Sequence, residues 1–131
     1  MAKKKETRPS SIKQALEITG EKMPKFTGMS KALKLHYESD FIWKTIVAAL
    51  NKQRDPNWVC DFANEDQVKY YAYAILKKDP KKRTGFGFSG TYCYCTNTLT
   101  DVGSRLRFAD PDDVIYALKT FEQEYIASVI Y

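Results

Sequence analysis

Side chains suited to acid–base catalysis or metal binding are sparse in this sequence. His36 is the only histidine, and none of its sequence neighbours forms an acid–base pair with it. Cys60, Cys93 and Cys95 could join His36 as metal ligands. Structural zinc sites, however, usually pair cysteines about two to four residues apart in a turn and need a second pair elsewhere. We therefore expect no metal site, and we interpret the cysteines as small buried apolar residues.

The carboxylate cluster of Asp110, Asp112 and Asp113 has a structural explanation. Asp110 fits a helix N-cap, and Pro111 fits the first helical position, where its missing N–H costs nothing. The other two aspartates favour the positive end of the helix dipole. The sequence has no Walker-type phosphate loop, no nucleophile elbow and no zinc-protease helix motif. We therefore expect no catalytic residues, no cofactor and no enzymatic activity.

Residues 83–92 hold the strongest hint of ligand recognition. Their Gly-Phe-Gly-Phe core is similar to the aromatic strand motif of RNA-recognition domains, whose rings stack on bases. The match is partial, because Thr84 and Thr91 stand where a basic and an aromatic residue are expected. We interpret the segment as a strand whose glycines permit close packing, with a bulge at Gly90. Base stacking stays open as the alternative.

A nucleic-acid surface would combine tyrosine rings with basic residues of neighbouring segments. Its affinity would fall steeply with salt, because phosphate contacts release counterions. The residues that we assign to this surface are Lys69, Tyr71, Tyr73, Lys81, Lys82, Arg83, Arg105 and Arg107.

Composition and charge limit which classes of protein this chain can belong to. The chain has 131 residues, 44% of them hydrophobic and 28% charged, which is typical of one globular domain. Residues 1–13 and 77–83 each carry a net +4, so the total of +5 leaves −3 for the rest. These two basic segments are either a nucleic-acid footprint or solubilising charge. No apolar run is long enough for a transmembrane helix, and no secretory signal is present. We expect a cytoplasmic protein with no membrane association and reduced cysteines.

The elements that position these residues follow from apolar periodicity and turn signals. Residues 1–10 are predicted to be a basic disordered arm, and residues 11–131 to be a single α+β domain. Ser10 or Ser11 caps a short helix over residues 12–19, and Ser30 caps a long helix over about residues 31–53. The buried stripe of that long helix is predicted to be Ala32, Leu33, Tyr37, Phe41, Ile42, Ile46, Val47 and Leu50.

The second half of the domain is predicted to be a sheet followed by one helix. Strands are expected at residues 68–76, 86–95 and 102–108, joined by short connections into an antiparallel meander. The last helix starts after Asp110 and runs to about Val129. Its predicted stripe is Val114, Ala117, Leu118, Phe121, Tyr125 and Val129. The fold is therefore helix, helix, three-stranded meander, helix, with the helices packed on one sheet face.

Several short motifs resemble one family of proteins. They are Lys69-Tyr70-Tyr71, the glycine-rich residues 85–89, residues 102–108, Pro56-Asn57-Trp58 and the Ala/Tyr-rich final helix at residues 114–125. Over residues 12–126 the chain resembles small uncharacterised proteins that are encoded by gut anaerobes and by their phages and prophages. The family has no established activity. The resemblance therefore implies a context, namely a phage or mobile-element accessory protein acting in the host cytoplasm.

Two main function classes remain after these observations. The first is a non-enzymatic interaction protein, a phage or mobile-element accessory factor that binds a protein partner or associates with itself. Exposed tyrosine and tryptophan suit this class, and its binding should depend little on salt. The second is a nucleic-acid or nucleotide-binding module that uses the aromatic and basic sheet face. A sheet face whose arginines are fully buried against acidic partners would weaken this second hypothesis. An enzyme of unfamiliar type is a further alternative.

Overall fold

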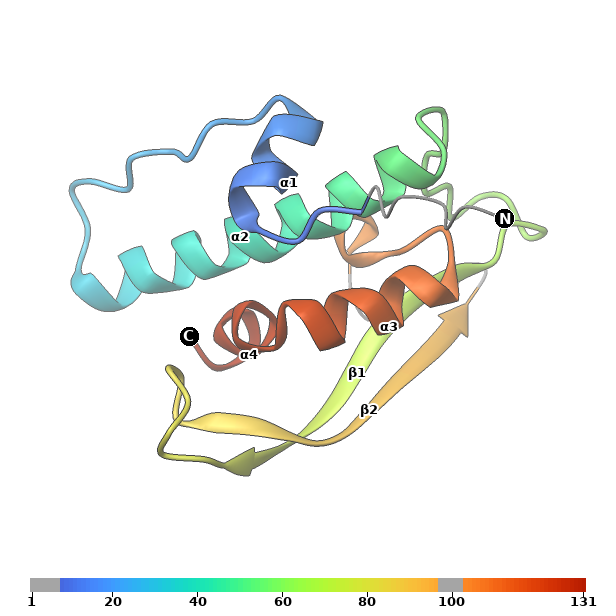
Figure 1. Ribbon diagram of the computed structural model, residues 1–131. Coiled ribbons are helices and arrows are strands. Elements are labelled where there is room, and N and C mark those ends of the chain that lie inside the picture. Colours follow the sequence, from blue (N-terminus) through green and yellow to red (C-terminus); the bar gives the residue numbers. More distant parts are fainter. Residues whose placement is uncertain (1–7, 97–102) are drawn as a thin grey trace, which may run out of the picture.

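The computed structural model describes residues 8–96 and 103–131, and its elements are arranged in layers (Figure 1). A two-stranded sheet forms one side, the two C-terminal helices lie on it, and the long helix and then the first helix follow. The elements in chain order are α1 (Ile12–Thr19), α2 (Lys31–Arg54), β1 (Lys69–Lys78), β2 (Phe86–Thr96), the 3-10 helix η1 (Ser104–Leu106), α3 (Pro111–Thr120) and α4 (Glu122–Ile130). The coarse α+β class is thus confirmed.

The helix starts follow from side-chain caps. The Ser11 hydroxyl accepts a hydrogen bond from the Gln14 N–H at 3.2 Å, and Ser30 accepts one from Leu33 at 3.3 Å. Asp110 accepts from the Asp112 N–H at 2.8 Å, with Pro111 in the first helical position. Each cap satisfies an N–H that the first helical turn leaves without an internal partner. The predicted starts of all three helices are therefore confirmed.

The sheet has two strands among the described residues, and the prediction of three is wrong. β1 and β2 pair antiparallel, with Tyr71 opposite Tyr94 and Tyr73 opposite Tyr92. The register shifts between Ile75 and Leu76, so Ser89 is left over as a bulge next to the predicted position at Gly90.

The predicted third strand at residues 102–108 is mostly irregular. Val102 lies outside the described residues, and Ser104–Leu106 form the 3-10 helix η1. Only Phe108 pairs with the sheet, through an isolated antiparallel bridge to Tyr70. The two backbone hydrogen bonds of this bridge measure 3.0 and 2.7 Å. One bridge anchors the segment on β1 but does not extend into a ladder.

The core lies between the sheet and the helices. Trp43 packs edge-on against both Phe108 and Tyr125, with ring centroids 6.3 and 5.1 Å apart. The inner sheet face adds Tyr70, Ala72, Ala74, Leu76, Phe86, Phe88 and Cys93. The predicted α2 stripe is correct from Ile46 onward. It is wrong at Ala32, Leu33 and Tyr37, which are exposed because the first turns of α2 extend beyond the other helices (Figure 1).

The predicted final helix is two helices. Phe121 has φ −120° and ψ 43°, which interrupts the helix between α3 and α4. The Phe121 side chain is buried, and the Val114, Ala117, Leu118 and Tyr125 part of the predicted stripe is buried as well. Val129 is exposed, so the stripe does not continue to the end of α4.

Residues 8–10 pack against α3, although the predicted disordered arm included them. Pro9 is buried, and its carbonyl accepts a hydrogen bond from the Tyr116 hydroxyl at 3.1 Å. The Arg8 guanidinium lies 3.2 Å from the Asp113 carboxylate and 4.9 Å from the centre of the Tyr116 ring. Residues 1–7 of the predicted arm lie outside the described residues.

Candidate functional site: a tyrosine face on the sheet

Four tyrosines gather on the sheet face that points away from the helices. Tyr71 and Tyr73 of β1 stand opposite Tyr94 and Tyr92 of β2, so the alternation of side chains places all four on one face. The ring centroids of the two directly opposed pairs are 5.9 Å apart, and Tyr73 and Tyr94 also meet edge-on at 5.6 Å. We call these four residues, together with Ile75, the tyrosine face.

The tyrosine face is open to solvent. Tyr73, Tyr92 and Tyr94 keep 47%, 45% and 49% of their surface exposed. Every helix lies on the opposite side of the sheet (Figure 1). Because the rings contact one another across the strands, they form one continuous aromatic surface. Aromatic side chains of this kind supply large contact areas at low entropic cost and are enriched in protein interfaces.

Lys69 and Arg107 are buried at one end of the tyrosine face. Both have 0% of their surface exposed. The Arg107 guanidinium lies over the Tyr71 ring at 4.5 Å and near the Phe62 ring at 5.7 Å. The Lys69 ammonium lies 5.5 Å from the Phe62 ring and donates to the Gln67 carbonyl at 2.9 Å. These two predicted phosphate-binding residues therefore pack beside Tyr71 at one end of the tyrosine face.

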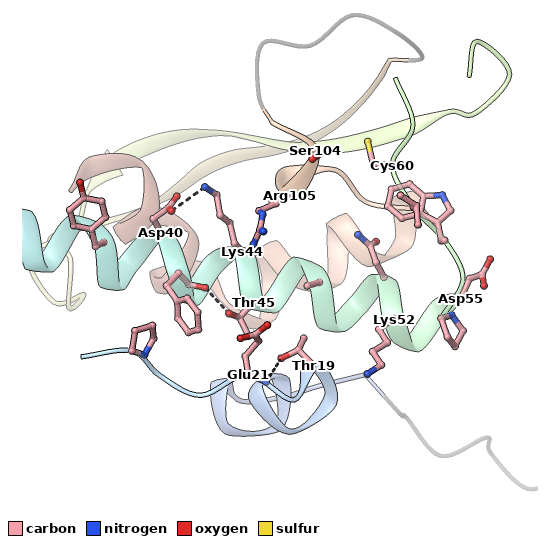
Figure 2. Close-up of a pocket in the computed structure, with 18 of the residues that line it drawn as sticks. Thr19, Glu21, Asp40, Lys44, Thr45, Lys52, Asp55, Cys60, Ser104 and Arg105 are labelled. Atoms are coloured by element: carbon pink, nitrogen blue, oxygen red, sulfur yellow. Dashed lines mark hydrogen bonds and ion pairs between the residues drawn. The ribbon is translucent and has the colours of Figure 1, made fainter. Parts of the chain in front are cut away.

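The other predicted basic residues lie in two separate places. Lys81, Lys82 and Arg83 are exposed in the loop between β1 and β2, and the Lys82 ammonium pairs with Glu122 of α4 at 3.2 Å. Arg105 is exposed on η1 and points toward α2 rather than toward the tyrosine face (Figure 2). The structure thus brings Lys69, Tyr71, Tyr73 and Arg107 together and leaves Arg105 apart.

A groove of about 730 Å³ runs along α2 (Figure 2). Its lining includes Lys44, Lys52, Arg105, Glu21, Asp40 and Asp55, three cations and three carboxylates. Asp40 and Lys44 pair with each other at 3.0 Å. The balanced charge does not select an anionic or a cationic ligand, and Phe26, Phe41 and Trp58 supply apolar walls. Sequence analysis did not find this groove, because loops distant in the sequence form its two sides.

The cysteines and the histidine do not gather into a metal site among the described residues. Burial raises the pKa of the Cys93 thiol, and burial likewise raises the pKa of Cys60 despite nearby Lys69 and Arg107. Cys95 is exposed. The His36 Nδ1 lies 3.0 Å from the Tyr131 carbonyl oxygen. Among the described residues, no three His, Cys, Asp or Glu side chains lie close enough together to hold a metal ion.

Comparisons with known proteins do not assign this chain to a family. No protein-family model, no curated protein and no solved structure matches the chain. None of the helices in the described part is long and apolar enough to span a membrane. The argument for function therefore rests on the tyrosine face and its surroundings.

Of the four tyrosines in the tyrosine face, Tyr71 and Tyr73 were predicted as site residues from the sequence, and Tyr92 and Tyr94 were not. The alternation of residues 86–94 placed Tyr92 and Tyr94 on one parity, which was the available signal. The register that puts them opposite β1 depends on the bulge at Ser89, and a single sequence does not fix that register.

Proposed function

We propose that this chain is a non-enzymatic interaction protein that binds an apolar, uncharged surface of a protein partner through its tyrosine face. The observation that carries the proposal is the set of cross-strand tyrosines, of which Tyr73, Tyr92 and Tyr94 are about half exposed, on a sheet face that none of the described helices covers. Tyr71, Tyr73, Ile75, Tyr92 and Tyr94 carry no charge, so the matching surface needs none. The resemblance to phage-encoded proteins adds the proposal of an accessory role for a phage or mobile element in the cytoplasm.

Support also comes from the burial of the nearby cations. Lys69 and Arg107 hold Tyr71 and Phe62 in place and do not reach solvent, so they offer nothing to a phosphate backbone. A preformed aromatic surface loses little entropy on binding, because its side chains are already ordered by their neighbours. Binding at such a surface should depend little on ionic strength.

The test is to select peptides from a random display library against the folded protein and to map the best binder by NMR. We expect the amide signals of residues 71–75 and 90–94 to shift on titration of the peptide. Shifts confined to the α2 groove around Lys44 and Arg105, with none on the sheet, would overturn the proposal. The full chain is used, and thermal unfolding of the labelled sample confirms that it is folded.

A nucleic-acid-binding module is the second candidate, and one observation favours it. The loop with Lys81, Lys82 and Arg83 is exposed at the end of the same two strands that carry the tyrosines. Tyrosine rings beside such a loop could stack on single-stranded bases. Fluorescence anisotropy with single- and double-stranded oligonucleotides at two salt concentrations, with and without residues 1–10, separates the candidates. Salt-sensitive binding that survives loss of residues 1–10 would favour this second function.

A further inference from the structure

One edge of the sheet is open along most of β2. On one side β2 pairs with β1. On its other side, none of the described residues hydrogen-bonds to the backbone of residues 87–95. The far edge of β1, by contrast, carries the bridge between Tyr70 and Phe108. Alternate N–H and C=O groups of residues 87–95 therefore have no backbone partner on this edge among the described residues, which is the arrangement that another strand can pair with.

The sequence of β2 lacks the residues that usually protect an open edge. Natural edge strands carry lysine, other charges or proline, which prevent pairing with further strands. The eleven residues of β2, FGFSGTYCYCT, include none of these, although 28% of the chain is charged. Only the start of β2 is protected against pairing. There Ser89 forms the bulge, and the Phe86 carbonyl accepts a hydrogen bond from Gln123 at 3.0 Å. Residues 91–95 remain as an uncharged pairing segment.

We infer that residues 91–95 pair antiparallel with the same residues of a second copy of this chain, with Cys93 opposite Cys93. The result is a two-fold symmetric dimer with a continuous four-stranded sheet. The segment has no charge, so identical strands meet without like charges opposite each other. Tyr92 of each copy then stands opposite Tyr94 of the other, which joins the two tyrosine faces into one surface.

Charge outside the strand sets the direction of pairing. The end of β1 and the loop after it, residues 77–83, carry a net +4 and lie at one end of β2. Parallel pairing would place two such loops side by side. Antiparallel pairing places them at opposite ends of a strand about 35 Å long, several times the Debye length of about 8 Å at physiological salt. The antiparallel dimer thus avoids the largest like-charge repulsion that the chain offers.

The dimer is tested with charge placed on the edge. Sedimentation velocity of the full chain should give twice the mass of one chain at about 100 μM, and Thr91→Lys should raise the dimer dissociation constant by at least about tenfold. Thr91 is exposed in the pairing segment, and Thr120→Lys at the exposed end of α3 adds the same charge elsewhere. The Thr120→Lys protein should dimerise like the unmodified chain. A monomeric unmodified chain, or a Thr91→Lys dimer of unchanged affinity, overturns the inference.

Hydrogen exchange provides a second readout that needs no variant. Alternate backbone amides of residues 91–95 should exchange at least about tenfold more slowly at a concentration where the dimer forms than at high dilution. Equal exchange at both concentrations would contradict pairing along this edge, even if Thr91→Lys failed to fold. The inference concerns the edge of the sheet and does not rest on the proposed function. A variant that loses peptide binding but still dimerises, or that binds peptide but no longer dimerises, distinguishes the dimer inference from the proposed function.

Discussion

Burial of Lys69 and Arg107 determines what these two cations can do. A surface lysine or arginine is available to phosphate, but a fully buried one must be held by carbonyl oxygens, aromatic rings or other partners. The Lys69 ammonium donates to the carbonyls of Asn64 and Gln67, and Arg107 lies over Tyr71. The two side chains therefore fix the loop before β1 and one end of the tyrosine face.

Asp113 on α3 is also a buried charged residue, and its removal should destabilise the fold. Its side chain is 2% exposed and accepts from Arg54 Nε at 3.2 Å and Nη2 at 3.0 Å. The Arg8 guanidinium lies 3.2 Å away as well. This hydrogen-bonded pairing raises the pKa of Arg54. Asp113→Ala should lower the free energy of unfolding in urea denaturation, because Arg54 and Arg8 lose their carboxylate partner. The loss should be limited to about 2 kcal/mol, because the partly exposed Arg54 guanidinium keeps part of its hydration.

Asp112→Ala is the matched control, since Asp112 occupies the same helical turn but is exposed. It should change the free energy of unfolding by less than about 1 kcal/mol, the size of a helix-dipole effect. Equal losses for the two variants would show that the ion pairs of Asp113 contribute nothing beyond the helix dipole.

Cys93 and Cys95 should react at different rates, although they lie two residues apart. Burial against the helices raises the pKa of the Cys93 thiol, so a smaller fraction is thiolate at a given pH. Cys95 is exposed near the end of β2. Iodoacetamide at pH 8, followed by mass spectrometry of the peptides, should label Cys95 first. The rate at Cys93 should continue to rise with pH above the pKa of an ordinary thiol. Faster labelling of Cys93 would contradict its placement on the inner face.

At the level of elements, Asn51 joins α2 to the segment after η1. Its amide Nδ2 donates to the Arg107 carbonyl at 2.8 Å, and its Oδ1 accepts from the Ala109 N–H at 2.9 Å. Asn51→Ala should lower the free energy of unfolding by about 2 kcal/mol, because two partly buried backbone groups lose their partners. Gln53→Ala, at an exposed position on the same helix, should change it by less than about 0.5 kcal/mol. Similar values for both variants would remove Asn51 from this role.

The elements that sequence analysis predicted well are those with local signals. Caps at Ser30 and Asp110 and the period-two alternation of β2 depend on residues a few positions apart. A single sequence is enough to detect these patterns, because caps and strand alternation depend only on neighbouring residues. The helices and the two strands were therefore placed to within a few residues.

The elements that sequence analysis missed depend on distant contacts. Residues 102–108 alternate like a strand, yet η1 packs against α2, and only Phe108 reaches β1. The alternation put Arg107 on a polar face, whereas the fold buries it between Phe62 and Tyr71. The break at Phe121 has no glycine or proline to mark it. A buried side chain, not a local breaker, accompanies the change of helix direction there.

For the molecule as a whole, the fold separates the surfaces that could bind. The tyrosine face lies on the outer side of the sheet, and the α2 groove runs along α2 from the end of α1 to η1. The sequence predicted aromatic and basic residues as one surface, but Arg105 belongs to the groove and Lys69 and Arg107 are buried. The exposed Lys81, Lys82 and Arg83 lie in the loop between the strands, and the tyrosine face itself carries no charge. This separation lets each surface be changed without touching the other.

The most direct test of the central claim compares the affinity of one selected peptide for three variants. Tyr73→Ala combined with Tyr92→Ala should weaken binding by at least about tenfold, which is about 1.4 kcal/mol, since interface tyrosines carry much of the binding energy. Arg105→Ala in the groove and Ile115→Ala on exposed α3 should stay within about twofold of the unmodified chain. Thermal unfolding confirms that all three fold. Unchanged affinity of the double tyrosine variant, with loss in Arg105→Ala, would contradict the account and move the binding site to the groove.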